Sequence, residues 1–132
     1  MTEEEIIAGV RECIGETLSI PLEEVGLDDK LIDDLGADSL DLLDLSFQMQ
    51  QRFHVTISPR DLERRTQEKL GEAPVAVDGV YSPEAMNEFR ANMPEIPIEE
   101  LRDGLAVADL PRCFRTSTMV RLVTRLLEEQ HA

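Results

Sequence analysis

The chain has 132 residues, 42% of them apolar, which is enough for one domain, or for a small domain with an appendage, around a packed core. Its formal net charge of −15 argues against nucleic acid as a partner, because the phosphates would be repelled, and favours basic protein partners. With four Phe, one Tyr and no Trp, the core must rest on aliphatic side chains, which favours an all-α fold of packed helices.

The first element expected along the chain is a helix over about residues 2–17. Thr2 followed by Glu5 forms a capping box, and the apolar residues after it repeat at helical spacing. Residues 19–38 contain a proline, two glycines and scattered apolar side chains, which predicts a long loop. Because loops of this length are rare unless they pack, we expect it to lie on the core.

A second helix is expected to begin after Asp38, which is a good N-cap, and to end near Phe53. Its buried side is predicted to carry Leu42, Leu45, Met49 and Phe53, joined by Leu43 and Phe47. Ser58 followed by Pro59 and Asp61 predicts a third, short helix toward Thr66. Together these helices predict a compact three-helix unit that ends near Gly71.

The second half of the chain begins with a predicted linker over residues 73–81. Ser82 and Pro83 predict the start of a fourth helix, which two further prolines end. A turn near residues 98–102 and an irregular stretch lead to a final helix, capped by Thr116 or Ser117. Since these residues offer few large apolar side chains, we expect them to fold back against the first unit.

The acidic charge is uneven, with 18 acidic and 7 basic residues before position 73 and 10 acidic and 6 basic residues after it. We therefore divide the chain into a first domain, 1–72, and a helical C-terminal extension, 73–132. The two cysteines have neither metal-site nor disulfide spacing, and Cys13 is expected to be a buried thiol. The chain start lacks the features of a signal peptide, and no apolar run would span a membrane, so we expect a cytoplasmic protein. We also expect a monomer.

The most informative residue is Ser39, at the first turn of the predicted second helix. The positive end of a helix favours a phosphodiester on an exposed serine hydroxyl, which is typical of a modification site. A nucleophilic serine would need a histidine nearby, whereas His54 lies roughly 20 Å away at helical rise. His131, the other histidine, lies in the tail. We predict no catalytic residue, no metal site and no enzyme activity.

The region around Ser39 resembles the acyl carrier protein family over about residues 3–70. The resemblance rests on Asp38-Ser39-Leu40 and on the following residues before and after it: Leu35, Gly36, Ala37, Asp41, Asp44, Leu45, Phe53 and Ile57. It implies a four-helix carrier to which a phosphopantetheinyl transferase joins 4′-phosphopantetheine from coenzyme A at Ser39, beside Asp38 and Leu40. The thiol of this arm would bear an acyl group as a thioester.

The partners that this resemblance implies are acyl-transfer or acyl-synthesis enzymes with basic patches, which would dock on Asp38, Asp41 and Asp44. Encounters of this kind are expected to be fast, weak and salt-sensitive. The family has acids at several positions where this chain has Gln48, Gln50, Gln51, Arg52, Arg60, Arg64 and Arg65. The weaker docking face predicts a specialised carrier with dedicated enzymes.

The extension resembles the tails of specialised bacterial carriers for unusual or very long acyl chains of lipopolysaccharide or other glycolipids. Its apolar residues either enclose a long acyl chain or simply hold the extension in place; they are Met86, Phe89, Met93, Leu122, Val123 and Leu126. Its arginines either pair with acids or remain solvated. We expect that a chain without residues 74–132 can still be modified at Ser39 but is less stable.

Three other readings remain. A calcium module would use Asp33, Asp34, Asp38, Asp41 and Asp44, but their spacing lacks the pattern of an EF-hand loop. A polyketide or peptidyl carrier is an alternative within the same class. A non-carrier acidic interaction module with an unmodified Ser39 is the alternative from another class.

Overall fold

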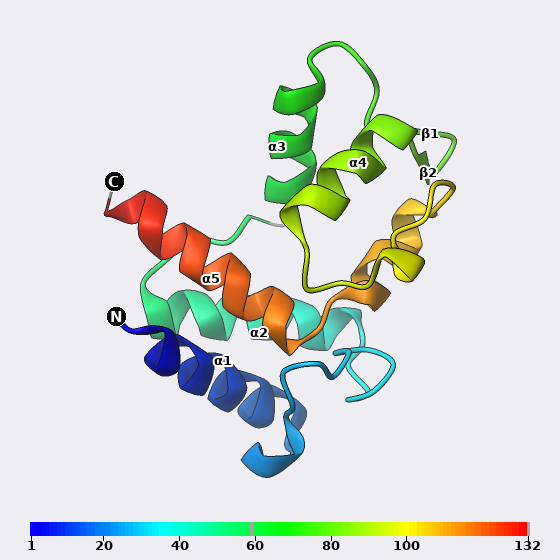
Figure 1. The fold of residues 1–132 in the computed structure, drawn as a ribbon. Helices are drawn as coiled ribbons and strands as arrows, with labels where there is room; N and C mark the ends of the chain where they lie inside the picture. The colour runs from blue at the N-terminus through cyan, green and yellow to red at the C-terminus, as the bar shows by residue number, and fades with distance from the viewer. Residues whose placement is uncertain (59, 132) are drawn as a thin grey trace. The chain divides into compact units, whose positions relative to one another are not determined.

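The computed structural model describes residues 1–58 and 60–131, and within them the chain is mostly helical (Figure 1). The predicted all-α class is confirmed, because the one sheet found there has two strands of two residues each. The elements in chain order are α1 (Glu3–Leu18), η1 (Leu22–Glu24), α2 (Ser39–Phe53), α3 (Asp61–Leu70), β1 (Ala76–Val77), β2 (Val80–Tyr81), α4 (Pro83–Asn92), η2 (Ile98–Glu100), η3 (Val107–Cys113) and α5 (Thr116–Gln130).

The chain forms two compact units, which are Met1–Ile57 with Phe114–Ala132, and Ser58–Cys113. The first unit therefore combines the two ends of the sequence, and the second unit is inserted between them. This grouping follows contacts and does not coincide with the division into 1–72 and 73–132. That division rests on charge and linker composition and stays a prediction.

The first unit is a bundle of α1, α2 and α5, each of which contacts the other two (Figure 1). Val10, Ile14 and Val123 are fully buried in its core. The prediction that the third helix completes this bundle is wrong, because α3 belongs to the second unit. The reason lies in the side chains: α3 is mostly charged and buries only Thr66, whereas α5 carries a long apolar stripe.

The start of α1 follows the predicted capping box. The Thr2 side chain accepts from the Glu5 backbone N–H, and the Glu5 carboxylate accepts from the Thr2 N–H at 3.1 Å. Because the hydrogen bonds from Thr2 favour the charged form, they lower the pKa of Glu5. Cys13 is buried as predicted, and burial raises the pKa of its thiol.

The start of α5 differs from the prediction by one residue. Thr116 and Ser117 are the first two residues of the helix, and Arg115, which is buried, is the residue before it. The Arg115 backbone N–H donates to the Thr118 hydroxyl at 3.2 Å. The hydroxyl that caps this backbone thus comes from inside the helix.

The second unit contains α3 packed on α4 and a small hairpin. The predicted linker forms strands β1 and β2, with Val77 opposite Val80. Asp78 and Gly79 both have positive φ, as a two-residue hairpin turn requires, so the Asp-Gly pair between two valines was the available signal. The predicted fourth helix is confirmed as α4, with Ser82 as its cap.

The beginning of α3 is only partly as predicted. The helix starts at Asp61, and the residue before it, Arg60, makes no side-chain cap. Pro59, which the sequence places at the helix start, lies outside the described residues. The helix continues to Leu70, beyond the predicted end near Thr66.

Candidate functional site

The start of α2 is fixed by two reciprocal hydrogen bonds. The Asp41 backbone N–H donates to Asp38 Oδ1 at 2.9 Å, and the Asp38 N–H donates to Asp41 Oδ2 at 3.1 Å. This capping box confirms Asp38 as the predicted N-cap. Ser39 is therefore the first residue of a well-defined helix of 15 residues.

The Ser39 side chain is exposed, as are its neighbours Asp38 and Leu40. An exposed hydroxyl at the first turn of a long helix fits a phosphodiester, since the positive helix end favours negative charge. The carboxylates of Asp38 and Asp41 already accept backbone N–H groups, which holds them in place beside the serine. The arrangement suits a group attached to Ser39 that extends into solvent.

The loop before Ser39 packs onto the core as predicted, with Val25 and Leu31 fully buried. Near its end, the Ala37 N–H donates to the Leu31 carbonyl at 2.8 Å. Gly36 has a φ of 80°, a left-handed conformation that glycine adopts without strain. The turn at Gly36 thus directs the chain from the core to the exposed start of α2.

A nucleophilic role for Ser39 gains no support from the histidines. His54 follows the last residue of α2, at the opposite end from Ser39. A helix of 15 residues is about 22 Å long, far beyond hydrogen-bond reach. His131 follows the last residue of α5, on another helix. Ser39 has no histidine positioned on its own helix turn to serve as a base.

The outer side of α2 carries an exposed apolar stripe that the sequence analysis assigned in part to the core. Leu40, Leu43 and Phe47 are 74%, 62% and 60% exposed, and their spacing places them on one side of the helix. The prediction that Leu43 and Phe47 join the buried side is wrong, because the core side is formed by Leu45, Met49 and Phe53. We call Leu40, Leu43 and Phe47 the α2 stripe.

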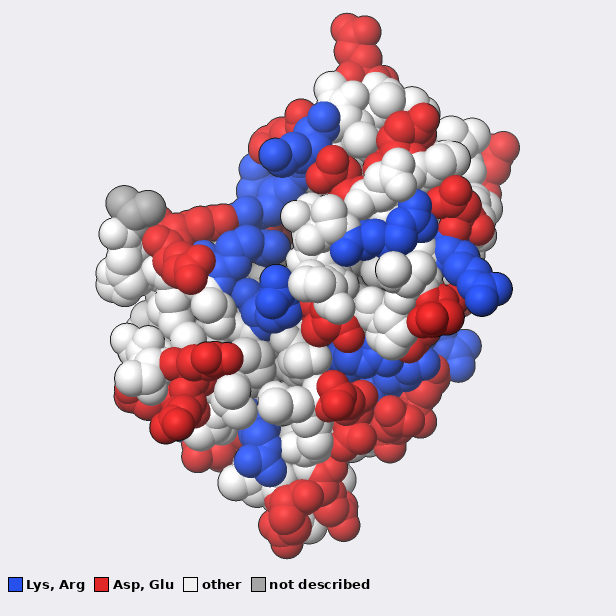
Figure 2. Space-filling view, viewed as in Figure 1, with Lys and Arg blue, Asp and Glu red and all other residues white. Residues whose placement is uncertain are grey.

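The charges around the α2 stripe are acidic. Asp38 and Asp44 are exposed and Asp41 is half-buried. Figure 2 shows acidic side chains, with basic ones among them, over the lower part of the view, where α1 and the loop before α2 lie. The predicted docking acids therefore lie beside an apolar surface that begins next to Ser39.

Two of the departures from the family pattern have structural roles in the first unit. Gln50 Oε1 accepts from the Ile57 backbone N–H at 3.1 Å, which links the residues that follow α2 back to this helix. Arg52 forms an ion pair with Glu12 on α1. This pair raises the pKa of Arg52, chiefly through the hydrogen bond from its guanidinium to Glu12. Gln50 and Arg52 thus each link α2 to another part of the first unit.

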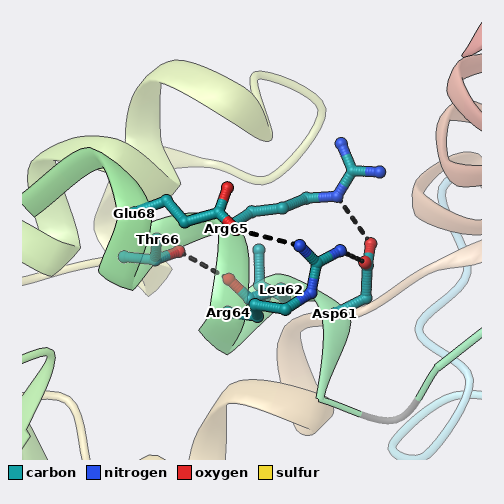
Figure 3. A network of polar contacts seen from close by, with 6 residues as sticks. All are labelled: Asp61, Leu62, Arg64, Arg65, Thr66 and Glu68. Atoms are coloured by element: carbon teal, nitrogen blue, oxygen red, sulfur yellow. Dashed lines mark hydrogen bonds and ion pairs between the residues drawn. The ribbon is translucent and has the colours of Figure 1, made fainter.

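The arginines of α3 are engaged within their own helix (Figure 3). Arg64 contacts Asp61 at 2.7 Å and Glu68 at 3.0 Å, and Arg65 contacts the same Asp61 at 2.7 Å. The hydrogen bond to Asp61 is the main cause that raises the pKa of Arg64. Pairs at this spacing stabilise a helix that has few apolar residues, and the three acidic residues of α3 equal its three basic residues in number.

Comparison with known proteins identifies the family of the chain. A family model described as "Phosphopantetheine attachment site" matches residues 8–73. The acyl carrier protein of Petrotoga mobilis is 45% identical over 64 residues, which are 48% of this chain and 75% of that protein. The acyl carrier protein of Thermotoga maritima is 44% identical over 63 residues, 48% of this chain and 78% of that protein. No solved structure matches the chain significantly.

The matched residues include Ser39 and all of α2, and they end before α4 and α5. Among the described residues, no helix is both long and apolar enough to cross a membrane. The resemblance seen around Asp38-Ser39-Leu40 is confirmed by the family match. The chain belongs to the acyl carrier protein family, whose members are carriers rather than enzymes and bear a covalently attached 4′-phosphopantetheine group.

Proposed function

We propose that Ser39 carries the 4′-phosphopantetheine arm and that the thiol of this arm carries acyl intermediates as thioesters. The observation that supports this most directly is the exposed serine at the first position of α2, held there by the Asp38–Asp41 capping box. This serine also lies within the residues that the family model matches. The chain's own task is thus to hold one hydroxyl in a fixed, open position.

Attachment of the arm forms one bond and breaks another. The Ser39 Oγ bonds to the phosphorus next to pantetheine, and the bond from that phosphorus to the rest of coenzyme A breaks, while the hydroxyl proton leaves. The base for this proton belongs to the phosphopantetheinyl transferase on this proposal, because α2 places no histidine near Ser39. Asp38 and Asp41 orient the helix start and do not take part in the transfer.

The docking surface that we propose combines the α2 stripe with Asp38, Asp41 and Asp44. An exposed apolar stripe next to the modified residue suits an enzyme surface that is apolar in its centre and basic at its rim. Charge attraction speeds the encounter and is screened by salt, while a small apolar contact keeps the complex short-lived. A carrier must leave each enzyme after delivery, and this surface would permit that.

We further propose a specialised pathway for the acyl group, such as fatty-acid, lipopolysaccharide or other glycolipid biosynthesis with dedicated enzymes. Gln50 and Arg52 support a specialised pathway, because these two positions of α2 make contacts within the first unit and do not provide docking acids. A polyketide or peptidyl carrier is the second candidate. The run Gly36-Ala37-Asp38-Ser39 resembles fatty-acid or polyketide carriers more than peptidyl ones.

The test of the arm site is the intact mass of the protein after incubation with coenzyme A and a broad-specificity phosphopantetheinyl transferase. We expect one added arm on the wild type and none on Ser39→Ala, which keeps a good helix former at the first position of α2. Addition to the Ser39→Ala variant would place the arm elsewhere. No addition, while a standard acyl carrier protein is modified in parallel, would support the non-carrier alternative.

The docking surface makes its own prediction. Leu43→Ser should lower kcat/KM for arm attachment on the order of tenfold, because it removes apolar contact area while leaving the fold intact. Val77→Ser is the matched control, since Val77 is 56% exposed in the second unit and is expected to have no effect. Equal rates for both variants, measured at low and high salt, would contradict a docking role for the α2 stripe.

A further inference from the structure

The loop that leads to Ser39 is joined to the start of α5 by three backbone hydrogen bonds. The Leu31 N–H donates to the Phe114 carbonyl at 3.0 Å, and the Thr116 N–H donates to the Asp29 carbonyl at 3.1 Å. The Ser117 N–H donates to the Leu27 carbonyl at 2.9 Å. Between these bonds, Lys30 and Arg115 pair as an antiparallel bridge. We call residues 27–31 and 114–117 together the clasp.

The clasp is shielded from water at its centre. Leu31 and Thr116 are both fully buried, and Arg115 is 5% exposed. A buried backbone N–H that loses its acceptor has no water to replace it, so the bonds donated by the Leu31 and Thr116 N–H groups are costly to break, whereas the bond from Ser117 to the exposed Leu27 is less shielded. The clasp therefore holds the loop firmly, although it uses only a few residues.

Leu31 links the clasp to the site. Its N–H donates to Phe114, and its carbonyl accepts from the Ala37 N–H, two residues before Ser39. Apart from the short η1 turn, the loop from Leu18 to Ser39 has no helix or strand of its own. Ordering such a loop costs conformational entropy, so its shape depends on its buried side chains and on the hydrogen bonds that fix it, among them those of the clasp.

We propose that residues 114–117 are positioning residues for Ser39: the start of α5 fixes the preceding loop and thereby the direction in which the serine is presented to the transferase. This inference rests on the proposed function of Ser39. Reacting atoms must approach within a narrow geometry, and a displacement of about 1 Å can reduce a rate on the order of a hundredfold. Residues 114–117 lie beyond the family match, whereas residues 27–31 lie within it, so the extension supplies one of the two segments of the clasp.

The variant that tests the clasp is Thr116→Pro. Thr116 is the first residue of α5, where proline is well tolerated, and Arg115 before it is extended, with φ −127° and ψ 177°, as a residue before proline prefers. Proline removes the N–H that donates to Asp29 and leaves the helix bonds intact. The matched control is Thr116→Val, which keeps this N–H and removes only a hydroxyl that has no hydrogen-bond partner.

Two measurements are needed, and the first uses the unmodified protein. In Thr116→Pro, hydrogen exchange at the Leu31 and Ala37 amides should accelerate at least tenfold, while the amides of Val120 and Val123 in α5 stay protected. Thr116→Val should match the wild type. Unchanged exchange at Leu31 and Ala37 in Thr116→Pro would overturn the clasp, whether or not Ser39 is ever modified.

The second measurement is the rate of arm attachment. Thr116→Pro should lower kcat about tenfold and leave KM within about twofold, because the α2 stripe is untouched. A purely structural role would leave the rate unchanged once the protein is folded. Faster exchange at Ala37 without a slower kcat would overturn the positioning role. A wild type that accepts no arm would instead refute the proposed function, and the exchange result would stand.

A second variant serves if Thr116→Pro does not fold. Asp29→Ala removes the carboxylate that accepts from the Gly26 N–H at 2.8 Å and so loosens the clasp loop from its other side. Asp28→Ala, at an exposed neighbour, is the control for the lost charge. Asp29→Ala should accelerate exchange at Leu31 and lower kcat more than Asp28→Ala does. Equal kcat for the two variants, with faster exchange only in Asp29→Ala, would overturn the proposal.

Discussion

Deletion of residues 114–132 is expected to unfold the first unit and to abolish arm attachment. The deletion removes α5, whose residues Met119, Val120 and Val123 belong to the core formed with α1 and α2. Burial of each such side chain contributes about 1.5–3 kcal/mol, and the total stability of a domain is only about 5–15 kcal/mol. Loss of all three, together with the clasp, therefore leaves little or no stability.

The measurement is amide exchange or NMR of α1 and α2 in the truncated chain. Tyrosine fluorescence would mislead, because the chain has no Trp and its one Tyr, Tyr81, lies in the second unit. Val123→Asp, at a fully buried position, should reproduce the loss of protection, whereas Glu128→Ala, at an exposed position of α5, should not. A truncated chain with wild-type protection in α2 and wild-type arm attachment would contradict the role of α5.

This expectation is stronger than the one drawn from the sequence, in which a chain without residues 74–132 loses stability but can still be modified. The difference comes from where the third helix of the bundle is found. The sequence predicts that the C-terminal residues fold back against the first unit, and α5 does so by packing on α1. It does not indicate that α5 takes the place of α3 in the bundle, because the contact of α5 with α1 joins the two ends of the chain. Only the apolar stripe of α5 and the charged composition of α3 indicated that α5, rather than α3, completes the bundle.

Local signals, in contrast, predicted local structure well. The capping boxes at Thr2 and Asp38 and the proline after Ser82 mark helix starts that the structure shows. Each of these signals depends on residues within one helix turn, so the sequence contains the whole interaction. The start of α5 was missed by one residue because its first N–H groups bond to Asp29 and Leu27, far away in the sequence.

In the candidate site, too, the features set by neighbouring residues could be predicted, and those set by distant contacts could not. Ser39, its cap and its neighbours follow from a short motif, whereas the α2 stripe does not. Leu43 and Phe47 could belong to either side of an apolar helix, and only the position of α1 and α5 decides that Leu45 and Met49 face the core. A helix with two apolar sides indicates a docking surface, because the bundle covers one side and the other remains exposed for a partner.

The contact between α1 and α2 supports the site from its far end and depends on one glycine. A Cβ atom added at Gly9 would lie 2.6 Å from Phe53 Cζ and 3.0 Å from Cε1. Phe53, the last residue of α2, is 3% exposed, so its ring is enclosed and has little room to move. Gly9 therefore lets α1 approach the helix that begins at Ser39.

Gly9→Ala should destabilise the first unit by about 1–2 kcal/mol, because overpacking costs about 1–3 kcal/mol and exceeds the gain of up to about 1 kcal/mol in helix propensity. Phe53→Ala should cost about 3–5 kcal/mol, since it leaves a cavity. In the Phe53→Ala background the steric conflict is absent, so Gly9→Ala should become stabilising by up to about 1 kcal/mol.

This reversal of sign is the decisive outcome. It is measured by denaturant unfolding of the wild type, the two single variants and the double variant, followed at the amides of α1 and α2. The coupling free energy between the two substitutions then isolates the contact between residue 9 and the ring. If Gly9→Ala destabilises equally in both backgrounds, the cost arises elsewhere than at Phe53. If it stabilises in both, the ring moves aside and the close approach of α1 and α2 does not require glycine.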